Sequence, residues 1–134
     1  MTRPRRRLAA PDPNGPQAAG ASITEEAFRR QVREVATHYG RTLKYHTHDA
    51  RRSDPGWPDE VFGHPDQRRT VFVELKTQDG LLRPAQVTWL RHLHASGCEA
   101  ALWRPVDMPH IVRVLGPVRE RAVPPAHILA QERP

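Results

Sequence analysis

The sequence predicts one α/β domain, in which a mixed central sheet is flanked by helices. Three observations predict this class. Apolar residues recur at helical spacing in two segments, short runs rich in β-branched and aromatic residues lie around them, and glycine and proline separate the segments. Their order along the chain is α-β-β-β-α-β-α, between residues 22 and 115.

The first helix is expected to begin at Ser22 or Thr24, because either hydroxyl can cap the first turn. Gly40 fits the position just after a helix C-terminus. Alternation over residues 42–48 then predicts a strand, and the run 49–58, rich in Arg, Ser, Pro and Gly, predicts a loop. The apolar residues of the helix follow a helical period: Phe28, Val32, Val35, Ala36 and Tyr39.

The later elements follow from the same kinds of signal. Residues 59–63 and 70–76 are expected to form two strands around a turn over residues 64–69. Pro84 fits the first position of a second helix, and Gly97 fits its end. Residues 98–103 predict a fourth strand, and residues 107–115 predict a short final helix.

Both ends of the chain have the composition of tails. Residues 1–21 combine Arg, Pro, Gly and Ala without periodicity, which predicts a flexible basic tail. Residues 116–134 begin with Gly-Pro and hold further prolines, which predicts an extended or loosely packed tail. The folded domain is therefore expected to span residues 22–115.

The net charge of +6 is concentrated in the N-terminal segment, where four arginines face one aspartate. A basic chain favours a polyanionic partner, because cationic side chains attract phosphate and release counterions. An arginine-rich tail that is merely solvated explains the same charge equally well.

Several classes of protein are excluded by composition. No run approaches the roughly 20 apolar residues of a membrane span, and the N-terminus lacks the apolar stretch of a secretory signal. Cys98 is the single cysteine, so no intramolecular disulfide can form. These features favour a cytoplasmic protein without membrane attachment.

The central hairpin is expected to gather charged groups on one face. If the turn closes symmetrically over residues 64–69, Val61 faces Phe72 and Asp59 faces Glu74. Directly opposed residues of an antiparallel pair share a face at about 5 Å, and Lys76 follows Glu74 by two residues on that same face. The residues on the other face are apolar: Phe62, Val71, Val73 and Leu75.

Two carboxylates so close repel each other unless a cation lies between them. Oxygen ligands at this separation suit Mg²⁺ or Mn²⁺, which commonly bind substrate phosphate as well. Lys76 could then position the attacking water or stabilise charge that develops on the phosphate. A surface cluster of salt bridges is the simpler alternative, because Glu-x-Lys is common in strands.

Six short sequence motifs, in this order along the chain, resemble those of the virus-type replication-repair nuclease (VRR-NUC) domain of the PD-(D/E)xK nuclease superfamily. The superfamily signature is matched by Pro58-Asp59 followed by Glu74-Leu75-Lys76, and the resemblance spans about residues 24–115. The six motifs are Tyr45-His46-Thr47, Arg51-Arg52-Ser53, Pro55-Gly56-Trp57-Pro58-Asp59, Val73-Glu74-Leu75-Lys76, Gln86-Val87-Thr88-Trp89-Leu90 and Trp103-Arg104-Pro105.

The resemblance implies a restriction-endonuclease-like fold and a catalytic centre carried by this hairpin. By the family's pattern, Asp59 and Glu74 bind Mg²⁺ or Mn²⁺, and the backbone carbonyl of Leu75 is a further ligand. Lys76 and Gln86 complete the catalytic set. Trp57 stands where the family more often has phenylalanine.

A glutamate of the first helix often completes the acidic cluster in this family, and Glu25 is our choice here. Glu25 lies on the side of Phe28, whereas Glu26 is rotated by about 100°. A simple helix-capping role for Glu25 is an equally good explanation.

Four residues near the loop are expected to contact DNA. Arg51, Arg52 and Ser53 could bind the phosphate backbone, although a solvated loop has the same composition. His46 could contact phosphate or support an acidic ligand. His46 and His48 could instead hold zinc, but no cysteine or histidine pair follows at a zinc-finger spacing.

The resulting hypothesis is a metal-dependent DNA endonuclease. The resemblance suggests branched DNA, such as a Holliday junction or a flap, during replication, repair or recombination. A small domain facing a large substrate suggests a homodimer. The rival hypothesis is a non-catalytic nucleic-acid-binding module on the same fold, and a zinc-dependent structural protein is a weaker third.

Overall fold

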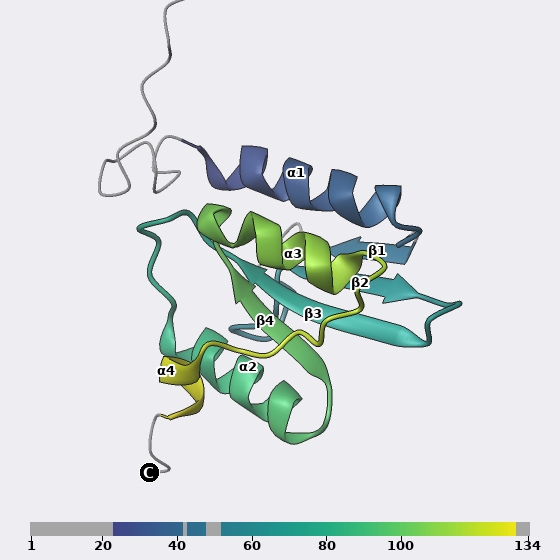
Figure 1. The fold of residues 1–134 in the computed structure, drawn as a ribbon. Coiled ribbons are helices and arrows are strands. Elements are labelled where there is room, and N and C mark those ends of the chain that lie inside the picture. The colour runs from purple at the N-terminus through teal and green to yellow at the C-terminus, as the bar shows by residue number, and fades with distance from the viewer. Residues whose placement is uncertain (1–22, 42, 48–51, 131–134) are drawn as a thin grey trace, which may run out of the picture.

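The structure, a computed structural model, describes residues 23–41, 43–47 and 52–130 (Figure 1). The predicted α/β class and the predicted order of elements are confirmed. The elements in chain order are α1 (Glu25–His38), β1 (Leu43–His46), β2 (Glu60–His64), β3 (Arg69–Leu75), α2 (Pro84–Ala95), β4 (Glu99–Trp103), the 3-10 helix η2 (Pro105–Asp107), α3 (Met108–Leu115) and α4 (Ala126–Leu129).

The four strands form one mixed sheet in the order β1-β2-β3-β4. β2 is antiparallel to both β1 and β3, whereas β3 and β4 are parallel. The predicted register of the hairpin is confirmed, because Val61 pairs with Phe72 and Phe62 pairs with Val71. The ladder ends where Glu60 pairs with Val73. Asp59 and Glu74 therefore follow at the open end of the hairpin, as the sequence predicted.

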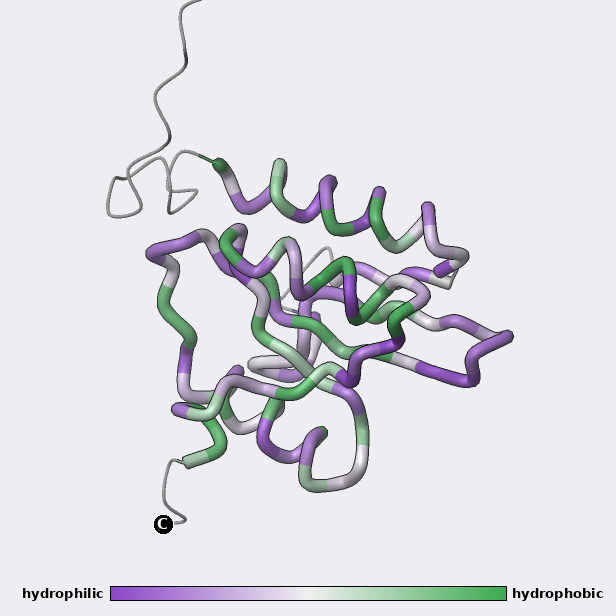
Figure 2. Tube along the Cα trace, in the orientation of Figure 1, coloured by the Kyte–Doolittle hydropathy of each residue, from purple (hydrophilic) through white to green (hydrophobic). Residues whose placement is uncertain are grey.

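Helices cover both faces of the sheet, α1 and α3 on one and α2 with α4 on the other (Figure 1). Figure 2 shows that β3 and β4 are largely hydrophobic, which matches their position between these layers. One core lies under α1 and α3, and its fully buried members include Phe28, Val32, Phe62, Val73 and Ile111. A second core lies under α2 and α4 and contains Leu90, Leu93, Ala100, Leu102 and Ile128.

The ends of α1 follow the capping signals in the sequence. Thr24 is the N-cap, and its hydroxyl accepts a hydrogen bond from the Ala27 N–H at 3.1 Å. Gly40 follows the helix with φ of +82°. Ser22, the alternative cap, lies outside the described residues, as do Thr42 and His48 of the predicted first strand.

The C-terminal segment differs from the prediction of a loosely packed tail. Ala122 and Pro124 are buried, and Ile128 of α4 is part of the second core. The Ala122 N–H also donates to Glu99 at 3.0 Å, which fastens this segment to β4. The packed part of the chain therefore continues beyond Leu115 to α4. Residues 1–21, the predicted basic tail, lie outside the described residues.

Candidate active site

The structure brings Asp59 and Glu74 together at the open end of the hairpin. One Asp59 carboxylate oxygen, Oδ2, accepts a hydrogen bond from the Leu75 N–H at 3.2 Å, so this side chain reaches across to β3. The Asp59 backbone carbonyl accepts a hydrogen bond from the Thr47 N–H at 3.0 Å. Asp59 is thus fixed by its side chain on one strand and by its backbone on the other.

Glu74 is a buried carboxylate, with 1% of its surface exposed. Its Oε1 accepts a hydrogen bond from Gln86 Nε2 at 2.8 Å and lies 3.7 Å from Lys76 Nζ. Its Oε2 has no hydrogen-bond partner among the described residues. An unpaired buried carboxylate oxygen is costly, so this position favours a cation or another donor.

The electrostatics of this pair point the same way. Burial, followed by the negative charge of Asp59, raises the pKa of Glu74 well above its ordinary range. Lys76 acts in the opposite direction but only partly offsets these effects. A divalent cation between the two carboxylates would remove the repulsion and favour the ionised form of both.

Gln86 is held in place by the first turn of α2. Its side-chain oxygen accepts a hydrogen bond from the Arg83 N–H at 2.8 Å, while its amide nitrogen donates to Glu74. Pro84 lies at the start of this helix, where its missing N–H costs no hydrogen bond. One side chain therefore caps the helix and orients the buried carboxylate.

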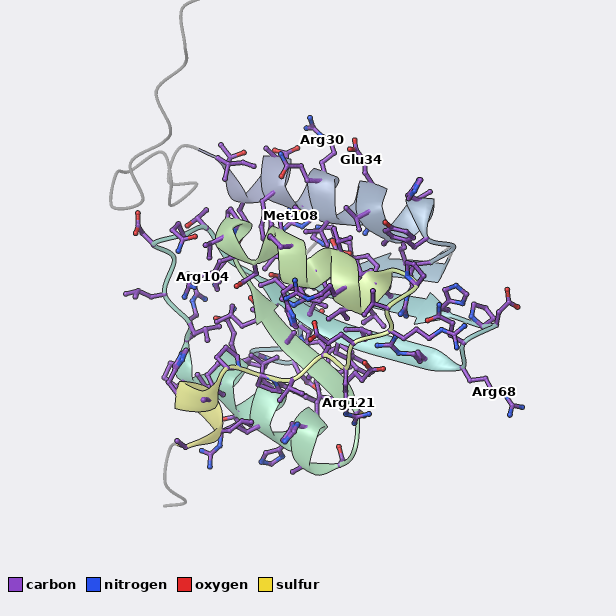
Figure 3. All side chains as sticks on the ribbon, viewed as in Figure 1. Arg30, Glu34, Arg68, Arg104, Met108 and Arg121 are labelled. Carbon is purple, nitrogen blue, oxygen red and sulfur yellow. The ribbon has the colours of Figure 1, made fainter. Side chains whose placement is uncertain are left out.

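Lys76 follows β3, and its N–H donates to the Trp103 carbonyl at 3.1 Å, which extends the parallel pairing with β4. The loop after it is gathered by Arg104, which Figure 3 shows beside the connection from β3 to α2. Arg104 Nη1 donates to the carbonyls of Thr77 and Gly80, both at 2.7 Å, and to that of Gln78 at 3.3 Å. Arg104, in the Trp103-Arg104-Pro105 motif, therefore holds the loop between Lys76 and α2 in place.

The loop of residues 52–58 docks against the beginning of α2. Trp89 Nε1 donates to the Pro55 carbonyl at 3.0 Å, and the Trp57 ring meets that of Trp89 edge-to-face at 4.9 Å. Gly56 has φ of +84°, and a Cβ there would lie 2.3 Å from backbone atoms of Ala85. The Pro55-Gly56-Trp57 motif and Trp89 therefore hold the loop against α2.

A hollow of about 350 Å³ lies between this loop and α2. Asp59 and Gln86 line it on the side of the hairpin end, and Ser53, Trp57 and Arg83 line it from the loop and the helix end. It is large enough for a small ligand, and Asp59 of the carboxylate pair forms part of its wall.

The predicted DNA contacts are only partly described. Arg51 lies outside the described residues, Arg52 is exposed, and Ser53 lines the hollow, while His48 of the alternative zinc pair also lies outside the described residues. His46 Nδ1 lies 3.2 Å from the Asp59 carbonyl and 3.1 Å from Glu60 Oε1. Its ring therefore contacts the backbone of Asp59 and the carboxylate of Glu60.

Glu25 is not brought to the carboxylate pair by any contact of the described residues. Its carboxylate lies 3.4 Å from Arg29 one turn further along α1, and its side chain is 43% exposed. Among the described residues there is no cluster of three His, Cys, Asp or Glu side chains that could hold a metal ion. Contacts therefore gather Asp59, Lys76 and Gln86 around Glu74 and its strand end, and among the described residues the contact of Glu25 is with Arg29.

Glu60 is a residue that the sequence analysis missed. It is fully buried, on the side of the sheet that α1 covers, and lies 2.6 Å from Arg33 and 3.4 Å from Arg29. Burial raises the pKa of Glu60 to about 7, although Arg33 and Arg29 favour the carboxylate. The signal was available, because alternation along β2 places this glutamate on the apolar face with Phe62.

None of the helices among the described residues is long and apolar enough to cross a membrane. A family model described as the VRR-NUC domain matches residues 1–106. No curated protein and no solved structure matches the chain.

Proposed function

The chain belongs to the VRR-NUC family, a nuclease family, and from this premise we propose that it is a Mg²⁺- or Mn²⁺-dependent DNA endonuclease. The observation that carries the proposal is the pairing of Asp59 with the buried Glu74 at the open end of the hairpin. Lys76 and Gln86 lie directly beside this pair.

The donor set fits a hard divalent cation. Asp59 and Glu74 supply carboxylate oxygens, and Glu74 Oε2 is buried without a hydrogen-bond partner among the described residues. The Leu75 carbonyl is the third ligand that we propose, since it belongs to the same strand end. Such an ion, when bound, lowers the pKa of a ligated water and offsets charge on the phosphodiester.

The chain's own residues supply the positioning. Lys76 orients the attacking water or stabilises the additional negative charge as the oxygen attacks phosphorus and the opposite P–O bond breaks. Gln86 holds Glu74 through a hydrogen bond, and the Leu75 N–H holds Asp59. Each carboxylate is therefore fixed before substrate binds.

The DNA strand is proposed to enter along the hollow between the 52–58 loop and α2. Ser53 and Arg83 line this hollow, and Arg52 directly precedes Ser53 in the sequence. These groups suit phosphate contacts, which position a duplex without reading its bases. Arg51 is proposed for the same role from the sequence.

Branched DNA is the substrate class that we propose, with a homodimer as the acting form. Two copies of so small a domain could place two active sites on two strands of a junction. The competing function is a binding module without turnover. The paired carboxylates speak against it, because they would repel phosphate in the absence of a cation.

The test is cleavage of end-labelled four-way junction, flap and linear DNA with Mg²⁺, Mn²⁺ or EDTA. Wild type is compared with Asp59→Asn and Lys76→Ala at equal salt. Lys44→Ala is the matched control, since Lys44 is the other lysine of the chain and contacts Thr37 at the surface. Metal-dependent cleavage that Asp59→Asn and Lys76→Ala abolish, while Lys44→Ala and DNA binding are unaffected, supports the proposal. Salt-sensitive binding with intact DNA in every lane would establish a binding module instead.

A further inference from the structure

Glu60 lies directly after Asp59 in the chain but points to the opposite side of the sheet. Asp59 lies with Glu74 and Gln86 of the α2 layer, whereas Glu60 contacts Arg29 and Arg33 of α1. These arginines are on the inner side of the helix. Figure 3 shows that Arg30 and Glu34 point outward from the same helix, away from the sheet.

The His46 ring lies between the Glu60 carboxylate and the backbone of Asp59. His46 pairs with Glu60 across β1 and β2, and its Nδ1 lies 3.1 Å from Glu60 Oε1 and 3.2 Å from the Asp59 carbonyl. The carbonyl is an acceptor, so Nδ1 donates this hydrogen bond, whereas its approach to Glu60 Oε1 is a charge contact without a hydrogen bond. The Glu60 carboxylate therefore lies against the ring that bonds to the carbonyl of Asp59.

The position of Glu60 beside the backbone of Asp59 distinguishes it from another buried, arginine-paired glutamate of the sheet. Replacing a buried ion pair by apolar residues of similar volume is often neutral or stabilising, so stability alone gives little reason for Glu60 at this position. Glu99 offers the contrast within the same sheet. It is also buried and paired with an arginine, Arg69, but it lies at the far end of β4 and its other partner is the Ala122 N–H.

We propose that Glu60 is a positioning residue, which acts through His46 and the α1 arginines to fix Asp59 for divalent metal binding. The proposal rests on the proposed function of Asp59 as a metal ligand. Glu60 does not touch the metal or the substrate. Its contribution is to hold the strand end, and with it the Asp59 carboxylate, at the separation from Glu74 that one ion can bridge.

The test is direct Mn²⁺ binding by isothermal titration calorimetry, on the full chain and without DNA. Wild type is compared with Asp59→Asn, Glu60→Gln and Glu99→Gln at a temperature at which circular dichroism shows all four folded. Loss of a partner that orients a metal ligand typically weakens metal affinity by about 10–100-fold. We expect Glu60→Gln to weaken Mn²⁺ binding by at least about tenfold. Glu99→Gln, which removes another buried paired charge, should leave the Mn²⁺ affinity as in wild type.

A second variant keeps the test decisive if Glu60→Gln does not fold. Arg33→Met removes the 2.6 Å contact with Glu60 but retains an unbranched stem for packing. It should shift Mn²⁺ affinity in the same direction by a smaller factor. In cleavage assays, either variant should raise the half-saturating Mn²⁺ concentration and recover most of the maximal rate at saturating Mn²⁺.

The outcomes separate the two proposals. If wild type binds Mn²⁺ and Asp59→Asn abolishes binding, but Glu60→Gln or Arg33→Met binds as wild type does, the positioning role is overturned and the metal site stands. Equal weakening by Glu99→Gln would also overturn it, since the effect would then follow general stability. If wild type does not bind Mn²⁺, both proposals fail.

Discussion

Gly56 offers a quantitative test of how closely the 52–58 loop is packed against α2. Its φ of +84° lies in the left-handed region, and a Cβ there would lie 2.3 Å from the carbonyl carbon and oxygen of Ala85. Gly97 is the matched control, because its φ is +89° but a Cβ there would meet nothing within 4 Å. An alanine at either position would adopt the same strained left-handed conformation, but only at position 56 would its Cβ clash with other atoms.

The expected costs follow from this difference. Gly97→Ala should lower the free energy of unfolding by about 1–2 kcal/mol, which is the cost of a left-handed conformation for an L-residue. Gly56→Ala should lose that amount and about 1–3 kcal/mol more, because backbone atoms of the helix must move to admit the methyl group. The displaced residue is the neighbour of Gln86, so the hydrogen bond to Glu74 should also be disturbed.

The assay is urea denaturation of both variants and wild type, followed by circular dichroism. The free energies of unfolding are compared if the three proteins have the same m-value. DNA cleavage under Mn²⁺ is measured in parallel, and it should fall for Gly56→Ala but not for Gly97→Ala. Equal losses of stability for the two variants would refute the reasoning. So would a Gly56→Ala protein that is as stable and as active as wild type.

Three further predictions concern individual hydrogen bonds. Gln86→Leu removes the donor to the buried Glu74 and should cost about 1–3 kcal/mol of unfolding free energy, measured by urea denaturation, and most of the cleavage rate. For Glu99, burial alone would raise the pKa, but the hydrogen bonds of Arg69 and the Ala122 N–H outweigh it and lower the pKa. The stability that Glu99 contributes is therefore complete above pH 4.5, its ordinary pKa, and is lost as the pH falls through the lowered pKa. The difference in melting temperature between wild type and Glu99→Gln should therefore narrow in acid. Arg104→Met removes hydrogen bonds to three loop carbonyls and should accelerate amide hydrogen exchange across residues 77–80, whereas unchanged exchange would contradict the bracing role.

Much of the fold could be predicted from the sequence because its signals are local. Thr24 caps its own helix, and Gly40 ends it, through contacts within a few residues. The hairpin register follows from a turn of known length and a period of two, which also predicts Asp59 opposite Glu74, one step beyond the Glu60–Val73 pair that ends the ladder. These inferences need no knowledge of how distant segments pack.

The remaining features depend on contacts between distant segments. Ala122 and Ile128 carry no periodic signal, and they are buried only because the chain returns across the sheet. The partners of Glu60 lie on α1, 27 residues earlier in the case of Arg33, so their pairing depends on the packing of the helix over the sheet. The hydrogen bond from Gln86 to Glu74 likewise requires α2 to be in place. The sequence could indicate these residues but not their partners.

The carboxylate of Glu74 and the backbone of Asp59 are in contact with groups from opposite layers of the domain. Glu74 is tied to α2 through Gln86, whereas Asp59 is linked to α1 through His46 and Glu60. A ligand that bridges the two carboxylates would therefore clamp the layers to each other across the sheet edge. Any loosening of either layer would then weaken that ligand, and the ligand in turn would stabilise both layers by mass action.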